Sequence, residues 1–273
     1  MAGHLVASGH DLIVHNRSMA KARAWTERHN GEVAATPAEA ASGADAIISC
    51  VGADDDLEAV TLGPDGAFGA MDAGTLFVDH TTVSAKIARR IAEEAAGRGL
   101  LALDAPVSGG QAGAENGQLA IMCGGTVEAF AAAQPLIGAY AARIVHVGEA
   151  GSGQLTKMVN QIAIAGVVQG LSEALHFAKS AGLDTGKVFE AISGGAAQSW
   201  QMVNRWQSMD EGRFDFGFAV DWMRKDLGLT LDEARRNGAR LPLAALVDQF
   251  YADVQAMGGG RNDTSSLIRR LTK

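Results

Sequence analysis

Three polar residues share one face of a predicted helix in the middle of the chain. Asn160 and Gln161 follow Lys157 by three and four positions, a spacing that brings side chains together on a helix. No charged residue follows Lys157 until Glu173, so the lysine has apolar surroundings. Partial burial tends to lower the pKa of a lysine, which suits proton transfer near neutral pH. A lysine that extends to water is the alternative, weakened because cations are disfavoured near the start of a helix.

A serine and two glycines follow a predicted buried strand. Residues 104–110 leave the apolar run 100–103, and Ser108, Gly109 and Gly110 end this segment. Open α/β sheets bind ligands at the carboxyl ends of their strands, and backbone N–H groups that lead into a helix favour an anion such as a carboxylate. On these residues alone, an ordinary glycine turn is the simpler interpretation.

An arginine follows the short apolar run 12–14, within the segment Asn16, Arg17 and Ser18. In dinucleotide-binding folds, residues at the tip of the second strand meet the adenosine ribose. An acidic residue there suits a 2′-hydroxyl, whereas an arginine suits a 2′-phosphate. Arg17 therefore favours NADP, with NAD still possible. A serine that caps the next helix beside a solvated arginine explains the same residues equally well.

The remaining polar residues indicate little further chemistry. Lys225 and Asp226 are, by themselves, typical of an exposed surface pair. The histidines have no metal-ligand spacing, and no Ser/His/Asp order with a nucleophile elbow occurs. Residues 54–56 are three consecutive aspartates, which cannot all face one ion. We therefore expect at 54–56 a solvated loop that can cap the next helix, and no metal site.

The elements that position these residues alternate in the first half of the chain. The short apolar runs are residues 12–14, 46–50, 76–78, 100–103, 119–122 and 144–145. Helical patterns lie between them at residues 19–29, 83–98 and 127–137. Such alternation predicts a doubly wound parallel sheet of the Rossmann type, covered by helices on both faces. The glycines after Met122 are interpreted as a structural turn.

The second half changes character. Long helical patterns without a convincing strand cover residues 154–181, 187–192, 198–209, 220–237 and 243–257. The sequence thus predicts a nucleotide-binding domain over residues 1–148, followed by an all-helical domain over 149–273.

The composition argues against several classes of partner. The net charge is −8 and the pI about 5.3, without a dense Lys/Arg run, so nucleic acid and anionic membranes are not expected. The longest uncharged stretch, 158–172, is too short and too polar to span a bilayer. Cys50 and Cys123 both lie in apolar runs typical of buried strands and imply no disulfide framework. With no signal-peptide pattern, we expect a cytoplasmic protein.

The start of the chain departs from the usual order. A helical pattern over residues 1–8 comes before the first apolar run, whereas a doubly wound nucleotide domain opens with a strand and a glycine-rich turn. Because the first strand of such a sheet lies in its middle, we expect this strand to be missing and the sheet to have a gap there.

Together, these motifs resemble the β-hydroxyacid dehydrogenase family, which contains 3-hydroxyisobutyrate dehydrogenase and tartronate semialdehyde reductase. The resemblance covers nearly the whole chain, at residues 9–10, 16–18, 79–84, 104–110, 113–114, 151–160, 199–200, 220–221, 225–227 and 263–266. Members of this family have a strand and a Gly-x-Gly-x-x-Gly turn before a Met-Ala pair that Met1 and Ala2 match. The resemblance implies that the strand and turn belong upstream of Met1.

The resemblance also implies a role for each candidate residue. Lys157 would be the general acid during carbonyl reduction and the base in the reverse direction. Asn160 would bind substrate and orient the reacting oxygen. The substrate carboxylate or hydroxyl would be held by Ser108, Gly109 and Gly110. The cofactor would contact Asn16, Arg17, Ser18, Cys50, Val51, Thr82, Lys225 and Asp226.

The implied activity is NADP-dependent interconversion of a small 3-hydroxyacid and its semialdehyde, without a metal, in a homodimer or homotetramer. The substrate would be 3-hydroxyisobutyrate, glycerate and tartronate semialdehyde, or glyoxylate and succinic semialdehyde. Val51 and Gly52 replace the Leu-Pro frequent in the family, and Gln161 replaces a second Asn. An inactive truncated fragment, or a non-catalytic binding module on the same fold, is the alternative, and retention of Lys157 and Asn160 argues against the module.

Overall fold

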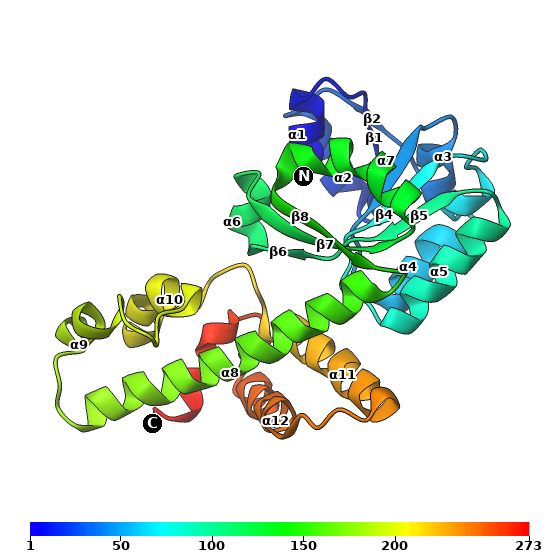
Figure 1. Cartoon of the computed structure of the whole chain (residues 1–273). Coiled ribbons are helices and arrows are strands. Elements are labelled where there is room, and N and C mark those ends of the chain that lie inside the picture. The colour runs from blue at the N-terminus through cyan, green and yellow to red at the C-terminus, as the bar shows by residue number, and fades with distance from the viewer. Residues whose placement is uncertain (273) are drawn as a thin grey trace. The chain divides into compact units, whose positions relative to one another are not determined.

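The computed structural model describes residues 1–272 and separates the chain into two compact units, Met1–Lys157 and Met158–Lys273. Each unit is described by itself (Figure 1). The long helix α8 (Ser152–Ser180) begins in the first unit and continues in the second. None of the described helices is long and apolar enough to cross a membrane.

The first unit alternates strands and helices, as its apolar runs predict. Its strands are β1 (Ile13–Val14), β2 (Glu32–Val33), β3 (Ala46–Ser49), β4 (Leu76–Asp79), β5 (Leu101–Asp104), β6 (Val107–Ser108), β7 (Leu119–Gly125) and β8 (Ala141–Gly148). Its further helices are α1 (Ala2–Ala7), α2 (Met19–Thr26), α3 (Pro37–Ala41), α4 (Asp54–Leu62), α5 (Ala85–Gly97), α6 (Gly110–Glu115) and α7 (Val127–Ile137).

Strands β3, β4 and β5 are parallel neighbours whose carboxyl ends lie in register, with Asp79 paired to Ser49 on one side and to Asp104 on the other. Strand β7 runs antiparallel to both β5 and β6 and parallel to β8. The doubly wound parallel sheet expected from the sequence is confirmed, with the pairing of β7 to β5 and β6 as an antiparallel exception. Only residues 109–118 join β6 to β7, which is too short for the crossover that a parallel pair requires.

Two local expectations around these strands are wrong. Gly124 and Gly125 continue β7 and pair with Asp104 and Leu103, so they form no turn after Met122. Cys50 is exposed just after β3, whereas Cys123 is buried as expected.

The sheet is interrupted on the β3 side. Strands β1 and β2 pair with each other in a separate two-stranded sheet, and β3 is the edge strand of the six-stranded sheet. Within the described residues, no strand bridges β1 and β3, which matches the gap expected from the sequence.

Alternating side chains of β4 bury the two faces of the larger sheet. Leu76 and Val78 pack in a core with residues of α1 and α7, whereas Phe77 packs in a second core with residues of α4 and α5. Figure 1 shows α7 and the pair α4 and α5 on opposite faces. Helix α5 begins at Ala85, two residues later than expected, because the Ser84 hydroxyl accepts a hydrogen bond from the backbone of Ile87 and caps it.

The second unit is helical where the sequence predicts helices. Besides α8 it contains α9 (Thr185–Ile192), α10 (Trp200–Asp210), α11 (Val220–Asn237), α12 (Pro242–Ala256) and the short 3₁₀ helix η3 (Thr264–Arg270). Ala165 and Val168 of α8 pack with Met223 and Leu227 of α11 and with Tyr251 of α12. This core fixes the face of α11 that carries the Lys225–Asp226 pair.

Candidate active site

The carboxylate of Asp104 holds the first turn of α8 at the carboxyl end of β5. Its Oδ1 accepts a 2.7 Å hydrogen bond from the N–H of Gly151, and its Oδ2 accepts a 2.9 Å bond from the N–H of Gln154. N–H groups at the start of a helix have no partner within the helix, so a carboxylate there satisfies them and complements the helix dipole. Burial raises the pKa of Asp104 to about 6 despite these bonds.

Two glycines allow this close approach. A Cβ atom on Gly153 would lie 2.5 Å from the carbonyl oxygen of Met122 and 2.6 Å from that of Asp104. A Cβ atom on Gly124 would lie 2.6 Å from Oδ1 of Asp104. No side chain fits at either position, so glycine at both sites lets the start of α8 contact the strand ends directly.

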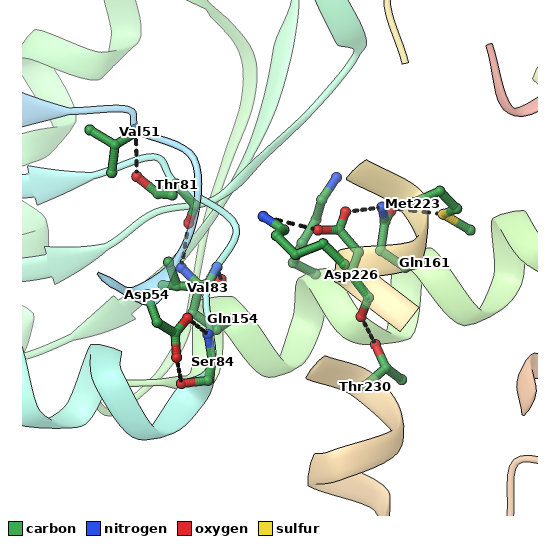
Figure 2. Close-up of polar contacts among 12 residues, drawn as sticks. Val51, Asp54, Thr81, Val83, Ser84, Gln154, Gln161, Met223, Asp226 and Thr230 are labelled. Atoms are coloured by element: carbon green, nitrogen blue, oxygen red, sulfur yellow. Dashed lines mark hydrogen bonds and ion pairs between the residues drawn. The ribbon is translucent and has the colours of Figure 1, made fainter. Parts of the chain in front are cut away.

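Gln154 ties the same turn to the loop that follows β4. Its side chain is fully buried; its Nε2 donates a 2.8 Å bond to the carbonyl oxygen of Thr81, and its Oε1 accepts a 3.1 Å bond from the N–H of Val83 (Figure 2). Thr82, a predicted cofactor contact, lies between these two anchored residues. The first turn of α8 and the Thr82 backbone are thus held together.

Lys157 follows one turn later and is 8% exposed. Its Nζ donates a 2.9 Å hydrogen bond to the carbonyl oxygen of Val107, the residue before Ser108. The structure thus brings the predicted acid–base residue next to the predicted carboxylate turn. Gly109 and Gly110 have φ angles of 129° and 61°, which other residues rarely adopt, so the turn requires them.

The ends of β3 and β4 are locked by Thr81. The N–H of Val51 donates a 2.9 Å bond to Oγ1 of Thr81 (Figure 2). The same hydroxyl donates a 2.6 Å bond to Oδ1 of Asp79. Asp79 is buried, and burial raises its pKa to about 7. Cys50 and Val51 are therefore presented on a rigid edge of the sheet, where the sequence predicts cofactor contacts.

Arg17 lies at the tip of β1 with an exposed side chain. Its Nη1 forms a 3.1 Å ion pair with Oδ1 of Asp56, and the two side chains are 91% and 38% exposed. The N–H of Ser18 bonds to Oδ1 of Asn16 at 2.9 Å, and the Ser18 side chain caps no backbone N–H of α2. The capping interpretation of Ser18 is therefore wrong. Asp56 belongs to the first turn of α4, so the loop expected at residues 54–56 is wrong as well.

The remaining candidate residues form a hydrogen-bonded chain in the second unit, and Figure 2 shows its bond from Gln161 to Asp226. Asn160 Nδ2 donates to Oε1 of Gln161 at 2.8 Å, and Gln161 Nε2 donates to Oδ2 of Asp226 at 2.6 Å. Lys225 Nζ lies 3.2 Å from Oδ1 of Asp226. Since Asp226 is only 4% exposed, the expectation of an exposed surface pair is wrong.

The residues that sequence reasoning missed are those that position the candidates rather than the candidates themselves. Asp104 lies at the start of a motif that was recognised, but its partners are 47 and 50 residues away. Gln154 lies beside the lysine motif and bonds to residues more than 70 positions earlier. Neither contact has a local sequence pattern that predicts it. The available signal was that Asp104 and Gln154 are polar residues close to glycines in segments expected to be buried.

Two family models match the chain, one for each half. Residues 1–148 match the NAD binding domain of 6-phosphogluconate dehydrogenase. Residues 151–271 match the NAD-binding domain of NADP-dependent 3-hydroxyisobutyrate dehydrogenase. The matches meet just before α8, at the place where the sequence changes character.

Proteins from several bacteria are similar to the chain over most of its length. An uncharacterised oxidoreductase of Shewanella frigidimarina is 61% identical, with 100% of the chain and 94% of that protein covered. The 3-hydroxyisobutyrate dehydrogenase of Pseudomonas aeruginosa is 33% identical, with 92% and 87% covered. A solved structure of 3-hydroxyisobutyrate dehydrogenase from Mycobacterium tuberculosis with L-serine is 30% identical, with 100% and 94% covered and a TM-score of 0.89.

Proposed function

Since the chain belongs to the β-hydroxyacid dehydrogenase family and is therefore an NAD(P)-dependent hydroxyacid dehydrogenase, we propose that it interconverts a small 3-hydroxyacid and its semialdehyde, with NADP as the preferred cofactor. The observation that carries this proposal is the 2.9 Å contact between Lys157 and Val107. It unites a candidate proton donor with a turn suited to a carboxylate.

The residues of the first unit divide the work between proton transfer and binding. A bound reduced nicotinamide supplies the hydride. Lys157 donates a proton to the carbonyl oxygen in reduction and accepts it from the hydroxyl in oxidation. Ser108 and the N–H groups of Gly109 and Gly110 hold the substrate carboxylate, because hydroxyl and N–H donors suit an anion. No metal is required for this division.

In the second unit, Asn160 orients the reacting oxygen through its amide. Its Nδ2 already donates to Gln161, so the amide has a fixed orientation. Lys225 and Asp226 are proposed to lie near the nicotinamide, a role that follows from the family resemblance.

The donor groups at the strand ends fit a dinucleotide phosphate. The exposed guanidinium of Arg17 stands at the carboxyl end of β1 and can donate two parallel hydrogen bonds to a 2′-phosphate. Asn16 and Ser18 flank it in a turn closed by their mutual hydrogen bond. Cys50, Val51 and Thr82 would contact the rest of the cofactor from the ends of β3 and β4.

We also infer a homodimer or homotetramer that works in the cytoplasm. Large apolar side chains are exposed in the second unit, among them Phe177 at 69% and Trp200 at 58%, which supports burial against another subunit. Both cysteines are free thiols, as a reducing compartment would keep them. Sedimentation of the purified chain would measure the mass of the assembly.

The experiment that tests the proposed function is a spectrophotometric assay with NADP and NAD. The substrates are the 3-hydroxyacids 3-hydroxyisobutyrate and glycerate, together with 4-hydroxybutyrate, the reduced form of succinic semialdehyde. The control is 2-hydroxybutyrate, whose hydroxyl lies next to the carboxylate. Turnover of a 3-hydroxyacid but not of the control would support the proposal. Binding of NADPH without turnover of any of these acids would contradict the proposed substrate class and favour a non-catalytic binding module.

A further inference from the structure

A buried carboxylate lies at one end of the polar chain in the second unit, and Asn160 lies at the other. Gln161 is fully buried between them and Asp226 is 4% exposed. Asn160 donates a 2.8 Å bond to Gln161, and Gln161 donates a 2.6 Å bond to Asp226, so the two bonds have the same direction. Figure 2 shows the second of them. The second N–H of Gln161 points to the sulfur of Met223 at 3.8 Å, so both of its amide hydrogens are used.

The direction of these bonds follows from the charge of Asp226. An ionised carboxylate only accepts hydrogen bonds, so Gln161 must turn its NH₂ group toward it. The ammonium of Lys225, 3.2 Å from Oδ1 of Asp226, favours that ionised form. Because the NH₂ group of Gln161 donates to Asp226, its Oε1 faces Asn160. Asn160 must therefore donate from its own NH₂ group.

These bonds also determine where the carbonyl oxygen of Asn160 points. An amide that directs Nδ2 toward Gln161 directs its carbonyl oxygen Oδ1 the other way. Without a fixed partner, an asparagine can flip and present either group. Here the Asp226 carboxylate, two hydrogen bonds away, determines that Asn160 presents Oδ1.

We propose that Asp226 and Gln161 are positioning residues that make Asn160 present its carbonyl oxygen, an acceptor for the hydroxyl of a 3-hydroxyacid. This inference rests on the proposed function, because the hydroxyl belongs to the substrate proposed above. A hydroxyl donates its single hydrogen to Oδ1 while Lys157 is an ammonium, and turns it to Nζ once that amine is neutral and can act as the base. The carbonyl of the semialdehyde has no hydrogen to donate. The chain therefore favours binding of the hydroxyacid over binding of the semialdehyde.

The first test is the isosteric variant Asp226→Asn, which keeps the shape of the side chain but removes its charge. The amides of Gln161 and Asn160 can then flip. We expect KM for the hydroxyacid to rise roughly 5–10-fold, the scale of one lost hydrogen bond, with little change in kcat for oxidation. In the reduction direction, KM for the semialdehyde should not rise, because a flipped Asn160 can donate to its carbonyl. The kcat for reduction should fall, because the equilibrium constant of the reaction is fixed and kcat/KM must change equally in both directions. The Kd of NADPH, measured by fluorescence titration, stays unchanged. Thr230→Val is the matched control, since its hydroxyl bonds only to the backbone oxygen of Asp226.

A double variant reverses the direction of the hydrogen bonds between residues 160 and 226. In Asn160→Asp with Asp226→Asn, residue 226 can donate to Gln161, which can flip and donate to the new carboxylate at 160. An acceptor is then presented again, so KM for the hydroxyacid should return toward the wild-type value. An unchanged KM in Asp226→Asn, or a loss confined to NADPH affinity, would overturn the proposal, as would a double variant no better than the single one.

A spectroscopic readout separates this inference from the proposed function. In the chain labelled with ¹⁵N-asparagine, Asp226→Asn should shift or broaden the side-chain amide signals of Asn160, and Thr230→Val should not. If the wild type oxidises no 3-hydroxyacid, the proposed function fails, and these signals still test the positioning. Identical Asn160 signals in the wild type and Asp226→Asn would overturn it.

Discussion

The ammonium of Lys157 donates a 2.9 Å hydrogen bond to the carbonyl oxygen of Val107. These residues are 50 positions apart and belong to two motifs that the sequence presents separately. The contact places Lys157, which no charged residue follows until Glu173, beside the Ser108 turn. A lysine that is 8% exposed needs such a partner, because an ammonium taken from water without hydrogen bonds is costly.

Replacing Asp104 by Asn should loosen the start of α8 in a way that depends on pH. The amide can accept only one of the two bonds from Gly151 and Gln154, so the free energy of unfolding should fall by about 1–2 kcal/mol. Because folding raises the pKa of Asp104 to about 6, its contribution is full below about pH 3.8 and is lost as the pH rises through 6. The stability gap between wild type and variant should therefore shrink between pH 4 and pH 8.

Urea unfolding of both proteins across this range measures the gap. His80, whose pKa burial lowers to about 4, titrates in both proteins and cancels in the difference. Burial raises the pKa of Asp79 to about 7, and repulsion from Asp104 adds to this, so Asp104→Asn should lower the pKa of Asp79 and shrink the gap further as the pH rises. A gap that widens with rising pH would contradict the burial of the Asp104 carboxyl.

Adding one methyl group at Gly153 should separate α8 from the strand ends. In Gly153→Ala the new atom would lie 2.5 Å from a backbone oxygen that cannot move aside, so we expect a loss of about 1–3 kcal/mol in the free energy of unfolding. Gly170→Ala is the matched control on the same helix. A methyl group at Gly170 would meet no atom within 4 Å, so it should stabilise the protein by about 0.5–1 kcal/mol. Thermal unfolding of the two variants would give shifts of opposite sign.

Arg17 and Asp56 together should determine the choice between NADPH and NADH. Arg17→Ala should weaken NADPH binding by roughly 10–100-fold, the value of a charged hydrogen bond, and leave NADH binding nearly unchanged. Asp56→Asn should strengthen NADPH binding by up to about fivefold, because Asp56 competes with the 2′-phosphate for an exposed arginine. Lys21→Ala is the control for loss of a nearby positive charge. Equal effects on the two cofactors in fluorescence titrations would exclude Arg17 as the 2′-phosphate contact.

Much of the fold could be predicted because its signals are local. The helices at 127–137 and 220–237 have the predicted bounds, since apolar periodicity marks their faces and Thr126 and Gly238 mark one end of each. Helix α3 was missed although the Thr36 hydroxyl accepts a hydrogen bond from the N–H of Glu39, and the Glu39 carboxylate accepts one from the N–H of Ala35. Five residues are too short for a periodic pattern. The antiparallel course of β7 depends on which strand it pairs with, and an apolar run does not encode that choice.

For the site, too, local signals were predicted and long-range contacts were not. Residue types and spacing identified Lys157, Asn160 and the Ser108 turn as candidates, but not what holds them. The Asp104 cap joins a strand to a helix far along the chain, and burial of Asp226 depends on how α11 packs against α8 and α12. Sequence spacing shows which side chains share a helix face, whereas only tertiary structure shows that a carboxylate is buried there and therefore must be paired.

The most direct test of the account is the kinetic comparison of Lys157→Ala with the wild type. Lys179→Ala, on the same helix, is the control for loss of a lysine. We predict that Lys157→Ala lowers kcat for a 3-hydroxyacid by roughly 10²–10⁴-fold while the Kd of NADPH is retained, the usual scale for one acid–base residue. Full turnover by Lys157→Ala would contradict the role of Lys157 in proton transfer and with it the proposed mechanism.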